Sequence, residues 1–228
     1  VKNFKATDFI DRKEVRKMDL YEQFAVVAAM EAVKDSGMDL ETVDKNRIGV
    51  VLGVGIGGIH TFQEEISYYA KNGEQTGPKF NPFFIPKMIA DIASGQISIM
   101  YGFHGPNYTT TSACASSTNA IADAFNLIRL GKANVMVTGG AEAAICEGGV
   151  GGFNAMHALS TRNDDPTRAS RPFSASRDGF IMGEGAGAVI LEEYEHAKAR
   201  GAKIYAEVVG YGSTCDAHHV TAPAEEAI

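Results

Sequence analysis

The 228-residue sequence has no tryptophan, only three cysteines, and no uninterrupted hydrophobic run long enough to cross a bilayer. The cysteines show no paired spacing, which argues against a disulfide framework and favours a reducing compartment. Basic residues are also few relative to acidic ones, because the chain has 21 lysines and arginines but 28 aspartates and glutamates. The resulting net charge of -7 argues against general nucleic-acid binding. No metal-ligand spacing is present, so no metal is expected.

Hydrophobic residues make up 45% of the chain and charged residues 21%, which is typical of a globular protein. Strand patterns alternate with helix patterns, and this alternation predicts α/β layering. Strands are expected at residues 47–53, 107–111, 134–138, 186–191 and 204–209, and helices at 13–36, 59–69, 87–100, 115–130 and 192–200. Residues 71–82 are expected to form a polar loop, 139–142 a turn, and 148–153 a glycine-rich stretch.

Cys114 stands at the junction between a predicted strand and a predicted helix. The strand formers of residues 108–111 precede it, and the small neighbours Ala113 and Ala115 allow a sharp turn. A thiol at a helix N-terminus is favoured in its thiolate form, which is the nucleophile. The backbone amide of Cys114 can also face a developing oxyanion. The pattern predicts a nucleophile elbow, whereas Cys146 and Cys215 are interpreted as ordinary small hydrophobic residues.

The stretch from Gly53 to Gly58 spells G-x-G-x-x-G directly after a predicted strand. Alone, this spelling suggests a dinucleotide-binding fold, but no acidic residue follows at the end of a second strand. We therefore interpret residues 53–58 as a loop that allows close packing. A second local feature is the basic cluster of Arg12, Lys13, Arg16 and Lys17. It is either a solvated helix face or a docking patch for an acidic partner.

Several motifs together resemble the β-ketoacyl-acyl carrier protein synthases, and they look most like the type II elongating enzymes of bacteria and organelles. The motifs are the elbow at 111–117 and the segments 135–142, 148–153, 158–163, 170–173, 177–180 and 183–187. The resemblance implies the thiolase-like layered α-β-α-β-α fold. It also implies that residues 1–228 form mainly the N-terminal half of that duplicated fold, and that residues 205–228 enter the second half.

The resemblance assigns roles to individual residues. Cys114 matches the nucleophile that accepts the acyl chain as a thioester, and Ile56 matches the gate residue that admits or limits that chain. Phe153 matches an acyl-pocket aromatic residue, Thr221 a threonine near the pantetheine entrance, and His219 a pocket-side position. The resemblance implies contacts with the acidic acyl carrier protein for Lys13, Arg16, Lys17 and Lys79. His157 stands where bacterial enzymes have a docking arginine.

The implied reaction has two half-reactions and needs no cofactor. Cys114 first takes an acyl group from acyl carrier protein, and malonyl carrier protein then decarboxylates to an enolate that attacks the acyl-cysteine. In the family, two histidines and a lysine needed for the second step lie beyond the equivalent of Ile228, and a first strand precedes Val1. We therefore expect that these residues alone do not condense acyl chains and that they fold poorly alone, because sheet edges are left unpaired.

Other interpretations stay open at this point. A polyketide ketosynthase would share the same motifs, whereas a chain-length factor is disfavoured because that subclass lacks the cysteine. A cysteine hydrolase would pair Cys114 with His219, and a non-catalytic fragment would use neither. The apolar residues 83–86 are either ordinary core or part of a homodimer contact. The expected compartment is the cytoplasm in a bacterium and a plastid or mitochondrion in a eukaryote.

Overall fold

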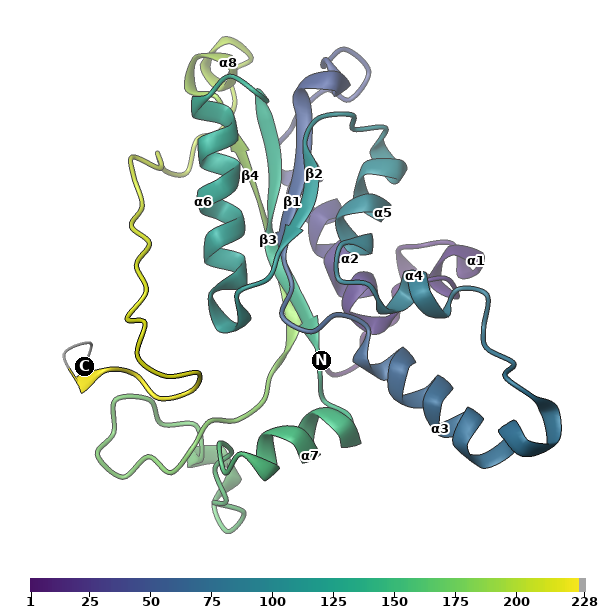
Figure 1. Cartoon of the computed structure of the whole chain (residues 1–228). Helices are drawn as coiled ribbons and strands as arrows, with labels where there is room; N and C mark the ends of the chain where they lie inside the picture. The colour runs from purple at the N-terminus through teal and green to yellow at the C-terminus, as the bar shows by residue number, and fades with distance from the viewer. Residues whose placement is uncertain (226–228) are drawn as a thin grey trace.

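The computed structural model describes residues 1–225 and contains a four-stranded sheet with helices on both faces (Figure 1). The sheet order is β2-β1-β3-β4. Strand β1 is parallel to β2 and β3, whereas β4 is antiparallel to β3. The strands are β1 (Ile48–Gly53), β2 (Asn107–Thr110), β3 (Val135–Ala143) and β4 (Glu184–Glu192). The predicted α/β class is confirmed.

Helix α6 lies on one face of the sheet, and α2 and α5 lie on the other (Figure 1). The α-helices are α1 (Arg12–Val15), α2 (Leu20–Asp35), α3 (Ile59–Thr76), α4 (Phe84–Met88), α5 (Ile92–Tyr101), α6 (Ser116–Arg129), α7 (Glu147–Ala155) and α8 (Tyr194–Ala199). Short 3-10 helices cover Ala6–Asp8, Lys45–Arg47, Ala113–Ala115 and Pro166–Arg168. Within the described residues, no helix has the length and apolar character needed to cross a membrane.

Strand β1 is buried along its whole length because helices cover both faces of the sheet. Its side chains alternate between two clusters. Val50 and Leu52 belong to the larger cluster beneath α2 and α5, whereas Val51 packs with Ala120 and Ala124 of α6. Alanine at these α6 positions lets the helix axis approach the sheet closely. The helix that follows Cys114 therefore rests directly on the central strands.

The predicted helix 13–36 is wrong as a single element, because it is divided between α1 and α2. The break is a capping box at Asp19. The Asp19 carboxylate accepts a hydrogen bond from the amide of Tyr21 at 3.3 Å, and Glu22 Oε1 accepts one from the amide of Asp19 at 2.9 Å. This reciprocal bonding satisfies amides that a new helix leaves unpaired, so α2 begins afresh at Leu20.

Helix α3 is longer than predicted, and residues 71–76 of the predicted loop belong to it. Its polar end contains good helix formers such as Lys71 and Glu74, and it projects from the body of the molecule (Figure 1). The predicted helix 87–100 is likewise two helices, α4 and α5. The backbone of Ile89 is extended between them (ψ 129°).

The predicted turn 139–142 is wrong, because β3 continues through it to Ala143. Gly139 allows this with φ 140°, and a Cβ there would lie 2.0 Å from the carbonyl oxygen of Gly187 on β4. The glycine-rich stretch 148–153 is helical within α7. The predicted strand 204–209 is also wrong, since those residues form no helix or strand. Of the expected segment 205–228, residues 226–228 lie outside the described residues.

Candidate active site

The chain turns sharply between β2 and α6, and Cys114 lies in that turn. The carboxyl ends of the parallel strands β1, β2 and β3 meet at one edge of the sheet. From Thr110, at the end of β2, the chain passes through the 3-10 turn Ala113–Ala115 into α6. Ala113 has φ 49°, an uncommon conformation for a residue with a Cβ. The predicted strand, elbow and helix are therefore all present.

Side-chain hydrogen bonds hold this elbow in place. Ser116 Oγ accepts from the amide of Ser112 at 2.9 Å and donates to the carbonyl oxygen of Ala113 at 2.7 Å. Thr110 Oγ1 donates to the carbonyl oxygen of Ser116 at 2.8 Å, and Asn119 Nδ2 donates to Ser112 Oγ at 2.6 Å. Ser116 is buried, so its bonds on both sides of residue 113 stabilise the positive φ angle.

Cys114 is exposed at the start of a 14-residue helix whose first turn holds no acidic residue. Within residues 1–225, no hydrogen bond engages the amide of Cys114, which leaves it available to an oxyanion. The other cysteines differ. Cys146 is half-buried at the N-cap of α7, a helix terminus that the sequence did not predict, and Glu147 follows it. Cys215 is exposed in the C-terminal segment.

Two glycines let α6 approach the sheet. A Cβ on Gly53 would lie 2.2 Å from the backbone carbon of Ser116, and one on Gly140 would lie 2.0 Å from Ser117 Oγ. The glycine-rich loop is crowded at its other end too, because a Cβ on Gly58 would lie 2.0 Å from the carbonyl oxygen of Lys87. The interpretation of residues 53–58 as a close-packing loop is confirmed.

Residues 54–58 follow β1 and carry Ile56, which is 45% exposed. They are here called the gate loop, after the role that the family resemblance predicts for Ile56. The carboxylate of Glu142, on β3, accepts from two consecutive amides of this loop. Oε2 accepts from the amide of Ile56 at 2.7 Å, and Oε1 accepts from the amide of Gly57 at 3.2 Å. Sequence reasoning gave Glu142 no role, because its partners are 85 and 86 residues away in the chain.

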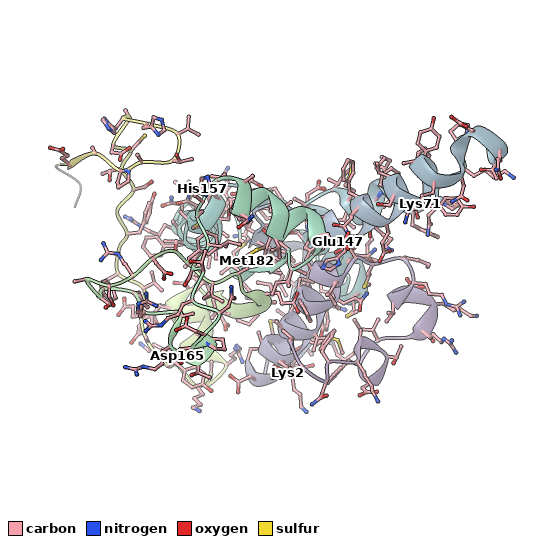
Figure 2. The ribbon with its side chains drawn as sticks, turned by 90° about the horizontal axis from the view of Figure 1, so that it is seen from below. Lys2, Lys71, Glu147, His157, Asp165 and Met182 are labelled. Carbon is pink, nitrogen blue, oxygen red and sulfur yellow. The ribbon has the colours of Figure 1, made fainter. Side chains whose placement is uncertain are left out.

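Phe153 lies in α7 and packs edge-to-face on Phe180, with ring centroids 5.2 Å apart. Figure 2 shows Glu147 and His157 at the two ends of this helix, with Met182 beside it. Phe180 is held by backbone bonds, donating to the carbonyl oxygen of Ala158 at 3.0 Å and accepting from the amide of Ser160 at 3.0 Å. His157 is exposed and ends the helix with φ 54°.

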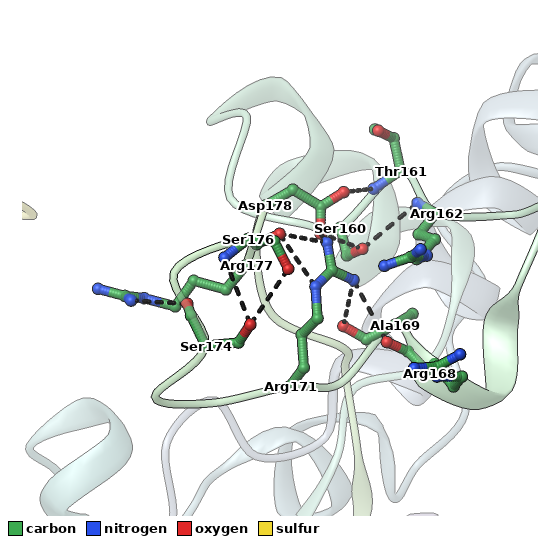
Figure 3. Close-up of polar contacts among 10 residues, drawn as sticks. All are labelled: Ser160, Thr161, Arg162, Arg168, Ala169, Arg171, Ser174, Ser176, Arg177 and Asp178. Atoms are coloured by element: carbon green, nitrogen blue, oxygen red, sulfur yellow. Dashed lines mark hydrogen bonds and ion pairs between the residues drawn. The ribbon is translucent and has the colours of Figure 1, made fainter.

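Arg171 organises the polar loop that leads to Phe180 (Figure 3). Its guanidinium donates to Asp178 Oδ1 at 3.0 Å and to the carbonyl oxygens of Arg168, Ala169 and Ser176. Asp178 also accepts from Ser160 Oγ at 2.7 Å, and this bond, with the Thr161 amide and Arg171, lowers the pKa of the Asp178 carboxyl. Residues 160–178 are thus fixed although they contain little regular structure.

His219 and Thr221 lie together in the exposed C-terminal segment, away from any helix or strand. His219 Nδ1 accepts from the amides of Thr221 and Ala222, each at 3.1 Å. Within residues 1–225, no hydrogen bond joins His219 to Cys114 or to the rest of the elbow. The hydrolase pairing of these two residues receives no support from this arrangement.

The basic residues fall into two groups. Lys13, Arg16 and Lys17 lie on α1 and directly after it, where Lys13 and Arg16 are exposed and Lys17 pairs with Glu14 at 2.7 Å. Lys79 is exposed in the loop after α3, beside a shallow hollow lined by Glu64, Glu65, Tyr68 and Asn81. No group of three or more metal-ligating side chains occurs in the part of the chain that the structure describes.

A buried polar junction joins α2 to α3. Asp19 Oδ2 accepts from the amide and the hydroxyl of Thr61, at 2.9 and 2.6 Å, so the cap of α2 also holds the start of α3. Glu22 is fully buried and its Oε2 has no partner among the described residues. Burial raises the pKa of Glu22 to about 8. Asp19 and Thr61 are 42 residues apart, so no local sequence pattern predicts this junction.

The fold and the elbow define an α/β protein that presents an exposed cysteine at a helix N-terminus. Residues 2–197 match the family model described as the β-ketoacyl synthase N-terminal domain. The chain therefore belongs to the β-ketoacyl synthase family.

Relatives and solved structures agree with this assignment. The chain is 52% identical, over 99% of its residues, to 3-oxoacyl-[acyl-carrier-protein] synthase 2 of Staphylococcus aureus, of which it covers 55%. A crystal structure of a β-ketoacyl synthase from Burkholderia phymatum superposes with TM-score 0.88 at 36% identity, covering 99% of this chain and 55% of that one. A ketosynthase bound to its type II polyketide acyl-carrier protein gives TM-score 0.72 at 25% identity, covering 89% and 55%. The chain spans about half the length of the curated relatives it matches.

Proposed function

We propose that this chain supplies the acyl-accepting half of a 3-oxoacyl-acyl carrier protein synthase of fatty acid elongation. The observation that carries the proposal is the braced elbow, with exposed Cys114 at the start of α6 and its amide free of hydrogen bonds within residues 1–225. The 52% identity to 3-oxoacyl-[acyl-carrier-protein] synthase 2, against 25% to the polyketide ketosynthase, supports fatty acid over polyketide chemistry. Residues 1–228 would correspond to the N-terminal half of the thiolase-like fold, with 205–228 entering the second half.

In the first half-reaction the sulfur of Cys114 attacks the carbonyl carbon of an acyl thioester. The carbonyl oxygen becomes an oxyanion that the amide of Cys114 stabilises, and the carrier thiolate leaves as the carbonyl re-forms. The product is an acyl-Cys114 thioester, with its chain directed by Ile56 and Phe153. Condensation with malonyl carrier protein then requires the histidines and lysine that the family resemblance places after residue 228.

Acyl carrier protein is the proposed partner at Lys13, Arg16, Lys17 and Lys79. Lys13 and Arg16 have no ion-pair partner within residues 1–225, so their charge is available to an acidic protein. Charge reversal at Lys13 and Arg16 should slow acyl transfer from the carrier protein about tenfold or more, because these charges speed encounter. Transfer from a small acyl thioester should be unchanged. A reversal at exposed Lys34, in the last turn of α2, serves as the control.

We also propose a homodimer. Four aromatic rings on α3, α4 and the loop between them form a row with neighbouring centroids 5.3–6.3 Å apart: Phe62, Phe84, Phe80 and Tyr69. Phe62, Tyr69 and Phe80 are exposed. Phe83 and Ile85 are exposed too, which is unlike ordinary core. Exposed apolar surface of this kind marks protein contacts. Sedimentation equilibrium should give twice the monomer mass, and a monomer at micromolar concentration would reject the dimer.

A single-turnover acyl-transfer experiment tests the function. The protein is mixed with acyl carrier protein that bears a labelled acyl chain, and both carrier thiol and acyl group are followed. We expect release of one equivalent of carrier thiol and formation of a stable acyl-protein. We expect no 3-oxoacyl product from these residues alone. Rapid release of free fatty acid that depends on His219 would instead establish the hydrolase. A protein that leaves the thioester intact under these conditions would overturn the proposal.

A further inference from the structure

Glu142 lies one residue before the end of β3, at the same edge of the sheet as the elbow. Its two carboxylate oxygens accept from the consecutive amides of Ile56 and Gly57, at 2.7 and 3.2 Å. Backbone bonds hold the gate loop near its two ends, and they include one from the amide of Ile59 to the carbonyl oxygen of Gly57 at 2.8 Å. The amide of Val54 donates to the carbonyl oxygen of Thr110 at 3.1 Å, and that of Gly58 donates to the carbonyl oxygen of Met88 at 3.1 Å. Glu142 therefore anchors the middle of the loop.

The loop passes between Glu142 and the elbow. A Cβ on Gly55 would lie 2.5 Å from Glu142 Oε2 and 3.9 Å from the carbonyl oxygen of Ala113, the residue before Cys114. Glu142, the gate loop and the nucleophile turn are thus packed into one cluster. Any movement of the Glu142 carboxylate changes the backbone of a loop that borders the elbow.

The side chain of Ile56 is 45% exposed, so side-chain packing does little to fix its direction. The backbone of residues 56 and 57 determines where that side chain points, and Glu142 fixes this backbone. Hydrogen bonds to a charged acceptor stabilise more than bonds between neutral groups. Their loss should free the middle of the loop while leaving both of its ends attached.

We propose that Glu142 is a positioning residue that sets the acyl-chain preference of the protein by holding the gate loop at Ile56 and Gly57. This inference rests on the proposed acyl transfer to Cys114. It assigns Glu142 no contact with the reacting atoms, and its effect passes through the loop backbone.

The first test removes the carboxylate with Glu142→Gln. An amide has one acceptor oxygen and one NH2 group, so it can accept from only one of the two loop amides and directs a donor at the other. Amide hydrogen exchange at Ile56 and Gly57 should accelerate about ten- to a hundredfold, while exchange in β1 stays unchanged. Glu147→Gln is the matched control, because Glu147 is exposed five residues away on α7 and should alter neither site.

The second variant moves the carboxylate without removing it. Gly55→Ala places a methyl group 2.5 Å from Glu142 Oε2, which is the end of a flexible side chain and can swing away. The same two amides should lose protection, and combining Gly55→Ala with Glu142→Gln should add little to either single change. Gly95→Ala, in open space on α5, is the control.

The functional readout is the ratio of acyl-transfer rates to Cys114 for a long and a short acyl thioester. Both variants should change this ratio at least severalfold, whereas a purely structural defect would lower both rates in proportion. A ratio that matches the parent in both variants would overturn the inference. If the parent itself is not acylated, the proposed function fails. The exchange data then still decide whether Glu142 holds the loop, since unchanged protection at Ile56 contradicts the anchor.

Discussion

Gly53→Ala is expected to push α6, the helix that follows Cys114, away from the sheet. Gly53 ends β1, and an added Cβ would lie 2.2 Å from the carbon and 2.4 Å from the oxygen of Ser116, and 2.3 Å from the nitrogen of Ser117. Ordinary contact begins near 3.4 Å, and every atom that would clash belongs to the backbone. Because no rotamer change relieves the overlap, the first turn of α6 must shift by roughly 1 Å. A misplacement of this size lowers the reaction rate about a hundredfold when it affects a reacting group.

The measurements are urea unfolding and the single-turnover rate of acyl transfer to Cys114. Overpacking of this kind destabilises by about 1–3 kcal/mol, and the backbone contacts argue for the upper end. Gly187→Ala is the matched control, since a Cβ at that strand position meets nothing within 4 Å. If Gly53→Ala unfolds at the same urea concentration as Gly187→Ala and transfers the acyl group at the parent rate, the close approach of α6 to β1 is not what positions Cys114.

Two further predictions concern groups away from the elbow. Burial raises the pKa of Glu22 to about 8 from 4.5, so the folded state keeps a proton that the unfolded state has lost, and stability should fall as pH rises from about 5 to 8. Glu22→Gln should remove this fall, and at pH 8 the variant should be more stable than the parent by up to about 4 kcal/mol in denaturant unfolding. If the unfolding free energies of variant and parent change with pH in parallel, the prediction is contradicted. Arg171→Lys should speed amide exchange across residues 160–178 about tenfold, because one ammonium cannot replace the fork that reaches Asp178 and three carbonyl groups. Arg177→Lys, which loses only one bond to the carbonyl oxygen of Ser174, is its control, and equal exchange in the two variants would show that Arg171 does not hold the loop.

The elbow could be predicted from sequence because all of its determinants are local. A run of strand formers, small residues around Cys114 and an amphipathic stretch follow one another within about twenty residues, so each local preference points to the same structure. The glycine-rich loop was interpreted correctly for a similar reason. A dinucleotide site requires an acidic residue at the end of a second strand, and the sequence has none there. The glycines were therefore interpreted as allowing close packing.

The errors have two physical sources. The break at Asp19 had a sequence signal, because Asp19 and Glu22 have the spacing of a capping box, but the apolar stripes on both sides concealed it. The hydrogen bonds of Glu142 to residues 56 and 57 had no local signal, since the sheet brings together partners that are 85 and 86 residues apart. Residues 204–209 have strand composition, but a strand also needs a neighbour, and composition does not provide one.

The most direct test of the central claim is the location of the acyl group. The protein contains Cys114 and Cys146 at helix N-termini and Cys215 in the C-terminal segment, so the three thiols compete within one molecule. After reaction with acyl carrier protein that bears an acyl chain, peptide mass spectrometry should find the acyl mass on Cys114 alone, and Cys114→Ala should remain unmodified. Acylation of Cys146 or Cys215 at a comparable rate, or acylation that persists in Cys114→Ala, would contradict the assignment of the elbow cysteine as the nucleophile.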